Sequence, residues 1–84
     1  MTPDEQKTDG FLRFDRTQPA GRKTPVVYVF NNDDGSHLGH ISWYGAWRQF
    51  CFFPSNNCVF HRGCLEGVNR QLVSLMAERK VKRS

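Results

Sequence analysis

Six of the eleven aromatic residues of this chain lie within the twelve positions from Trp43 to Pro54. Successive side chains of a β-strand point to opposite faces of the sheet, so a strand with aromatic residues at neighbouring positions is apolar on both faces. A helix can cover one of these faces, and the other then needs a second cover. Because large exposed apolar patches on small proteins mark interfaces, the stretch predicts a sheet with a binding surface.

The middle of the chain alternates between strand-forming runs and turns. Val26–Phe30 is rich in β-branched and aromatic residues, and Asp34-Gly35 after it is a hairpin-turn signal. A second turn at Tyr44–Ala46 and a third at Pro54–Asn57 separate the runs that follow. The pattern predicts an antiparallel β-meander of three to four strands at 26–30, 37–43, 47–53 and, as a short fourth, 58–60.

This arrangement also predicts which side chains share a face. With a tight turn at Ser55-Asn56, the fourth strand would place Cys58 and Phe60 on the same face as Cys51 and Phe53. His37 and His40 are three positions apart on one strand, so they are expected on opposite faces.

A single amphipathic helix is expected from Cys64 to about Lys80. Its apolar residues fall within a stripe about 100° wide, as helical periodicity requires. Gly63 is the expected N-cap. The helix would dock on one face of the sheet, which gives an α+β fold; the stripe comprises Leu65, Val68, Leu72, Leu75 and Met76.

The 84 residues fit one domain. Residues 1–24 are expected to be a mostly disordered arm with a short strand at 11–15, because they contain a single apolar patch, Phe11–Phe14. Residues 25–80 would form the single α+β domain, and residues 81–84 a basic tail.

Net charge and cysteine content restrict the ligands and the cellular compartment expected for the protein. The net charge of +4 is concentrated at Arg79–Arg83, which favours polyanions without identifying one. No run approaches the roughly 20 apolar residues that span a bilayer, so no membrane association is expected. Three cysteines, an odd number, fit a reducing cytoplasm better than a disulfide framework.

The cysteines and one histidine suggest a metal-binding hypothesis. Cys58, His61 and Cys64 are spaced by two residues each, and Cys51 precedes them. Four such ligands could hold zinc, which would make the chain a small zinc-stabilised module. Buried unpaired cysteine that packs as a small hydrophobe is the commoner outcome, so no cofactor is expected.

A catalytic role for Cys64 with His61 is the other chemical hypothesis. A helix N-terminus favours the thiolate, and a neighbouring histidine can act as a base. No carboxylate or amide that could orient the histidine is evident in the sequence. The chain is therefore not expected to be an enzyme.

The turn between the second and third strands is the expected partner-binding surface, formed by Trp43, Tyr44, Trp47 and Arg48. Tryptophan, tyrosine and arginine are the residues that most often anchor protein interfaces. Aromatic residues beside arginine also stack on nucleic-acid bases, so a nucleic-acid-binding accessory protein is the alternative. Its contacts would be Arg48, Arg70, Arg79, Lys80, Lys82 and Arg83.

The stretch Ile41–Pro54, which reads ISWYGAWRQFCFFP, with Gly63-Cys64-Leu65 beyond it, resembles small, largely uncharacterised proteins of tailed bacteriophages and prophages. The resemblance covers Val26 to Met76. It implies the cytoplasm of an infected bacterium and a non-catalytic protein that binds and inhibits a host or defence complex, for example CRISPR machinery. A homodimer through the second apolar face of the sheet is a further expectation.

Overall fold

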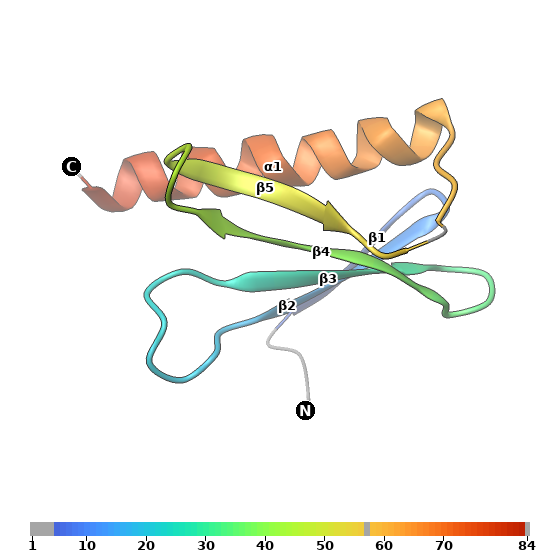
Figure 1. Cartoon of the computed structure of the whole chain (residues 1–84), viewed down its shortest axis with the longest axis horizontal. Coiled ribbons are helices and arrows are strands. Elements are labelled where there is room, and N and C mark those ends of the chain that lie inside the picture. Colours follow the sequence, from blue (N-terminus) through green and yellow to red (C-terminus); the bar gives the residue numbers. More distant parts are fainter. Residues whose placement is uncertain (1–4, 57, 84) are drawn as a thin grey trace.

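The structure, a computed structural model, describes residues 5–56 and 58–83. A five-stranded sheet carries one long helix, α1, along one of its faces (Figure 1). The strands pair antiparallel in chain order, so the sheet is a meander. The elements are β1 (Glu5–Asp9), β2 (Leu12–Thr17), β3 (Val26–Asn31), β4 (His37–Tyr44), β5 (Gln49–Pro54) and α1 (Arg62–Arg83).

The α+β class, the antiparallel sheet and the C-terminal helix are confirmed, but the predicted number of three to four strands is wrong. β1 and β2 lie in the segment expected to be a mostly disordered arm, and the short strand expected at 11–15 is the longer β2. Residues 1–4 lie outside the described part. Sequence reasoning missed β1 because its residues, EQKTD, carry no apolar signal.

The expected fourth strand at 58–60 is also wrong. These residues lie in the connection between β5 and α1 and have no strand geometry. Cys58 and Phe60 therefore do not pair with β5. The ring of Phe60 instead lies 5.4 Å from that of Phe52, edge to face.

The hydrophobic core lies between α1 and one face of the sheet. Five side chains of β2, β3 and β4 are almost fully buried there: Leu12, Phe14, Val27, Val29 and Ile41. Phe50 of β5 and Cys64, Val68 and Leu75 of α1 complete this cluster. Leu65, which was expected in the buried stripe, is 52% exposed, because the helix turns Cys64 and Val68 toward the sheet.

Two ion pairs fasten α1 to the first two strands. Arg70 contacts Asp9 of β1 with two nitrogen–oxygen distances of 2.8 Å. Arg16 of β2 contacts Glu78 at 2.7 and 2.8 Å. Both pairs have the two-pronged geometry of a guanidinium on a carboxylate, which fixes orientation as well as distance. The polar β1 thus helps to position the helix.

Gly39 produces a β-bulge in β4. Its neighbour across the sheet is Val29, whereas the next residue of β3, Phe30, pairs with His37, so β4 contains one extra residue. The extra residue shifts the alternation, and His37 and His40 come to lie on the same face of the sheet, where both rings are near Tyr28. The expectation that the two histidines face opposite ways is wrong for this reason.

We predict that Gly39→Ala lowers the free energy of unfolding, so that the protein unfolds at a lower urea concentration. Its φ of +154° is rare for residues with a side chain, and a Cβ there would lie 2.5 Å from the Phe53 carbonyl oxygen. The expected loss is about 3 kcal/mol or more, measured by urea denaturation. Gly45→Ala is the matched control, because a Cβ there meets no atom within 4 Å, and it should change stability by less than about 0.5 kcal/mol. Equal effects of the two substitutions would refute this account of the bulge.

Candidate functional site

The face of the sheet that points away from α1 is the candidate site, and we call it the open face. Tyr28 shows the alternation, since it is 38% exposed between Val27 and Val29, which are buried under the helix. The same rule places Tyr44 and Phe53 on the open face, opposite Trp43 and Phe52. The expected apolar second face is therefore present.

Seven rings on the open face and its adjoining turn form a continuous series, which we call the aromatic row. It begins at the β4–β5 turn, where Trp47 and Tyr44 lie 5.1 Å apart edge to face. It continues through Phe53 to His40, whose rings stack at 5.0 Å. From His40 it alternates between β3 and β4 and ends at Phe30 of β3. In order, the row is Trp47, Tyr44, Phe53, His40, Tyr28, His37 and Phe30.

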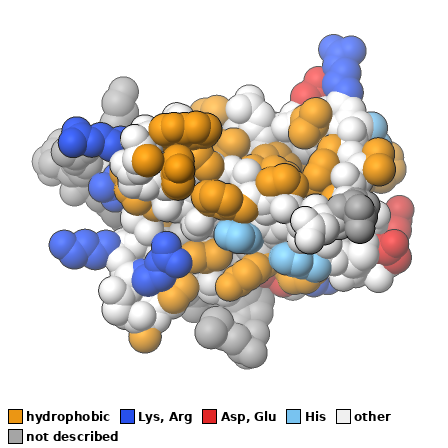
Figure 2. Space-filling view, viewed as in Figure 1, with side chains coloured by type: hydrophobic (Ala, Val, Ile, Leu, Met, Phe, Trp, Pro, Cys, Tyr) orange, Lys and Arg blue, Asp and Glu red, His pale blue; other side chains and the backbone are white. Residues whose placement is uncertain are grey.

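Much of the aromatic row is accessible to solvent. Trp47 is 67% exposed, Tyr44 39% and Tyr28 38%. Figure 2 shows histidine side chains lying among hydrophobic ones on the surface in view. Rigid aromatic side chains that already contact one another lose little conformational entropy on binding, so such a row suits the anchoring of a partner.

The β2–β3 loop covers one part of the open face. Beneath it, Thr17 and Ser42 are buried, and the Thr17 hydroxyl donates a hydrogen bond to the Val26 carbonyl at 3.0 Å. A hollow of about 290 Å³ remains beside the loop, lined by Pro19, Arg22, Val26, Tyr28, His40 and Ser42. Leu12 and Phe14, from the apolar patch of the N-terminal segment, do not contribute to this cover, because they lie under α1.

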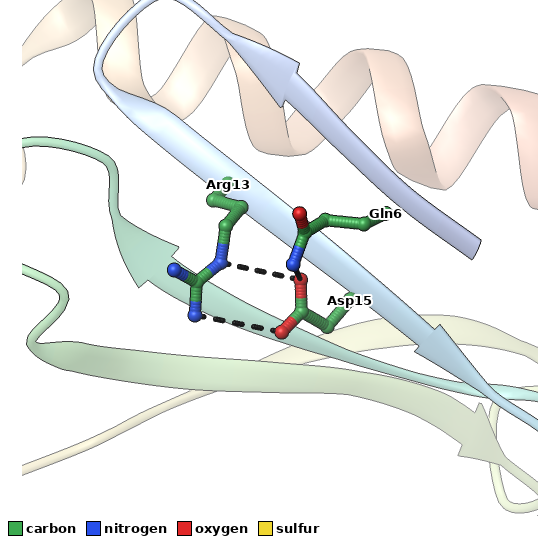
Figure 3. A network of polar contacts seen from close by, with 3 residues as sticks. All are labelled: Gln6, Arg13 and Asp15. Atoms are coloured by element: carbon green, nitrogen blue, oxygen red, sulfur yellow. Dashed lines mark hydrogen bonds and ion pairs between the residues drawn. The ribbon is translucent and has the colours of Figure 1, made fainter. Parts of the chain in front are cut away.

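A polar network closes the β1–β2 end of the open face (Figure 3). Asp15 accepts hydrogen bonds from the Arg13 guanidinium at 3.3 and 3.5 Å and from the Gln6 amide at 3.1 Å. Arg13 also lies above the Phe30 ring, with 4.5 Å between Cζ and the ring centre. The row therefore meets a polar border, an arrangement that resembles the apolar centre and polar rim of protein interfaces.

His40 is the titratable group with an altered pKa in the row. Its pKa lies below the ordinary value of 6.5, mainly because burial disfavours the charged ring, and further because the positive charges of His37 and Arg22 repel a proton. Protonation of this ring is therefore less favourable in the folded protein than in the unfolded chain.

The four residues expected to form one partner-binding surface are divided between the two faces. Tyr44 and Trp47 belong to the aromatic row. Trp43 faces α1, where its ring contacts Phe50 at 5.4 Å and lies under the Arg79 guanidinium at 4.0 Å. Arg48 is exposed in the turn, with a left-handed φ of 51°.

The residues of the nucleic-acid alternative do not all lie together. Arg70 is paired with Asp9. Arg48 and Arg79 line a common hollow with Trp43. Lys80, Lys82 and Arg83 follow on the last turns of α1, and their side chains lie outside the described part.

Of the four candidate zinc ligands, His61 and Cys64 are brought together. The Gly63 N–H donates to His61 Nδ1 at 3.1 Å, so this ring caps α1 in place of the expected Gly63, since the helix begins at Arg62. Nε2 then carries the ring proton and lies 3.4 Å from Cys64 Sγ. Within residues 5–56 and 58–83, no group of three or more histidine, cysteine or acidic side chains is placed to hold a metal ion.

Several residues of the site were missed by sequence reasoning. Phe53, Tyr28 and Phe30 were assigned to strands but not to a surface, although period-2 alternation from the buried Val27 and Val29 could have placed Tyr28 and Phe30. His40 and His37 depend on the bulge at Gly39. An isolated glycine inside a strand pattern was the available signal for that bulge.

The fold and the open face define a small α+β domain with an antiparallel meander, one helix and one uncovered aromatic sheet face. Over 74 residues the chain is 34% identical to the "Uncharacterized 9.3 kDa protein" of Acholeplasma phage L2, which covers 88% of this chain and 95% of that protein. The chain belongs to the family of that phage protein. This confirms the resemblance to small phage proteins, whereas the shared motif and the tailed-phage origin stay predictions.

No protein-family model matches the chain, and no solved structure matches it. Within the described residues, the structure has no helix that is both long enough and apolar enough to cross a membrane.

We predict that acid destabilises the protein through His40. The unfolded chain takes up a proton on this ring near pH 6.5, whereas the folded protein takes it up only at a lower pH, because its His40 pKa is lowered. The free energy of unfolding should therefore fall as pH drops below about 6.5 and level off below the lowered pKa. Urea denaturation about one pH unit above and below 6.5 measures this fall, which should be smaller in His40→Gln. An equal fall in both proteins would contradict the assignment.

Proposed function

We propose that this protein is a non-catalytic binding protein of phage type that anchors a protein of the bacterial host, or of a bacterial defence complex, on its open face. The aromatic row is the observation that carries the proposal. Its seven rings contact one another across three strands, while the helix covers the opposite face.

The aromatic content of the row supports a protein partner. Tryptophan and tyrosine are enriched among the residues that dominate binding energy, and they act best where neighbouring groups exclude water. Trp47 is 67% exposed, and the Tyr44 ring packs against it edge to face at 5.1 Å. Trp47 and Tyr44 at the turn would therefore contribute most of the binding energy, and the rest of the row would add contact area with the partner.

The proposed activity is inhibition by occupancy, as in an inhibitor of a defence complex such as CRISPR machinery. Its support is the membership of a phage-protein family together with the open face. His61 favours this over catalysis at Cys64, because its Nδ1 is occupied by the Gly63 N–H and its Nε2 presents a proton to the thiol. A histidine in that form donates to the sulfur and does not remove its proton.

We predict a stoichiometric complex with one bacterial protein, recovered by affinity pull-down from host lysate treated with nuclease. In binding assays with that partner, Trp47→Ala should weaken affinity about 30-fold, a loss of about 2 kcal/mol, without lowering the thermal midpoint. Phe11→Ala is the matched control, because it removes another exposed ring, 56% accessible, that contacts His61 outside the row.

Three outcomes would contradict this proposal. Affinity that is unchanged in Trp47→Ala would exclude the turn as the anchor. Equal losses in Trp47→Ala and Phe11→Ala would point away from the open face. A row occupied by a second copy of the chain would appear as a dimer by light scattering that Trp47→Ala dissociates.

A further inference from the structure

A second candidate site lies beside the β4–β5 turn, next to Trp43 and not in the aromatic row. It is a hollow of about 370 Å³ lined by Trp43, Gly45, Arg48 and Arg79. Two of its four lining residues carry a guanidinium group, and none carries a carboxylate. Because Trp43 and Tyr44 point to opposite faces of β4, this hollow is separate from the proposed partner surface.

Arg79 is held at this site by the ring of Trp43. Its Cζ lies 4.0 Å from the ring centre, and the Trp43 ring is itself supported edge to face by Phe50 at 5.4 Å. The Nε of Arg79 is buried, and within residues 5–56 and 58–83 it has no hydrogen-bond partner. A buried donor without a partner is unfavourable, and an anion that neutralises the Arg79 guanidinium offsets part of that cost.

Arg48 brings the second cation to the hollow. Its backbone φ of 51° is uncommon for a residue other than glycine, and its N–H donates to the Gly45 carbonyl at 3.3 Å. Strained backbone of this kind persists where the surrounding structure imposes it, and it gathers at ligand sites. The tight turn thus keeps Arg48 on the rim of the same hollow as Arg79.

The charges around the hollow favour a strongly anionic ligand. Figure 2 shows lysine and arginine side chains gathered at the left end, where Figure 1 places the end of α1 and the β2–β3 loop. Glu78, which precedes Arg79, is paired with Arg16 at 2.7 Å. The basic sequence Lys80–Arg83 continues along the last turns of α1. The field at this end therefore attracts anions.

We propose that this hollow binds the phosphate group of a nucleotide or of a nucleic-acid strand. Two guanidinium groups repel each other across a shared space unless an anion neutralises them. Phosphate oxygens match the fork of guanidinium donors and can accept from both arginines at once. The hollow opens to solvent, so the sugar of a nucleotide can extend beyond the bound phosphate group.

The fluorescence of Trp43 provides a direct test. Trp47→Phe leaves Trp43 as the single tryptophan, so changes in emission report events at the hollow. In this background, adenosine monophosphate, a 12-nucleotide thymidine strand and inorganic phosphate are titrated separately at low salt. We expect saturable binding of at least one of the two nucleotide probes. Adding Arg48→Gln or Arg79→Gln should weaken it at least about tenfold.

Arg62→Gln is the matched control, because it removes the same charge from the other end of α1, where Arg62 pairs with Glu66. It should change affinity less than about twofold. For the strand, each arginine lost at the hollow should reduce the slope of log affinity against log salt by about one.

The outcomes separate the two sources of phosphate. Tighter binding of the strand than of the mononucleotide identifies a nucleic-acid site, whereas equal affinity per molecule identifies a nucleotide site. Equal losses of affinity in Arg62→Gln and Arg48→Gln would show that the effect comes from net charge alone, which would overturn the proposal. Saturation by none of the probes, or by inorganic phosphate alone, would also overturn it.

Discussion

The structure depends on the docking of one helix on one face of a sheet that is apolar on both faces. The buried cluster of Val27, Val29 and Ile41 with Val68 and Leu75 holds the two layers together. At about 25 cal/mol for each Å² of apolar surface buried, contacts of this kind are the main stabilising term in a domain of this size. A single helix cannot cover both faces, so the aromatic residues of the other face remain at the surface.

The edge of the sheet controls where that helix lies. Asp9 and Arg16 are polar positions on the covered face of β1 and β2, and each forms a two-pronged ion pair with α1, to Arg70 and Glu78 respectively. Exposed ion pairs add little to stability, but their geometry restricts the register of the helix along the sheet. Gly67 allows the close approach, since a Cβ there would lie 3.2 Å from the Leu12 side chain.

The β4–β5 hairpin separates the aromatic residues into two environments. Trp43 and Phe50 face the helix, where Arg79 covers the indole ring. Tyr44 and Phe53 face the opposite way and join the histidines of β4. One short sequence thereby contributes to both proposed sites, the aromatic row and the hollow between Arg48 and Arg79. Alternation of side chains along β4 is the physical cause of this separation.

The amino-acid sequence by itself determined the α+β class, the meander of the central strands and the presence of the C-terminal helix, because these depend on local periodicity. It also predicted that the second sheet face is apolar and needs a cover that the helix does not supply. Of the two N-terminal strands, the sequence indicated β2 as a short strand at 11–15 but not β1, since β1 carries no apolar pattern and is fixed by pairing with β2 and by the Asp9–Arg70 contact. Only the tertiary structure decided which side chains make up the two surfaces. The bulge at Gly39 brought His37 and His40 onto one face, and the docking angle of α1 brought Arg79 onto Trp43. Both depend on contacts between residues distant in the chain, which local sequence patterns do not encode.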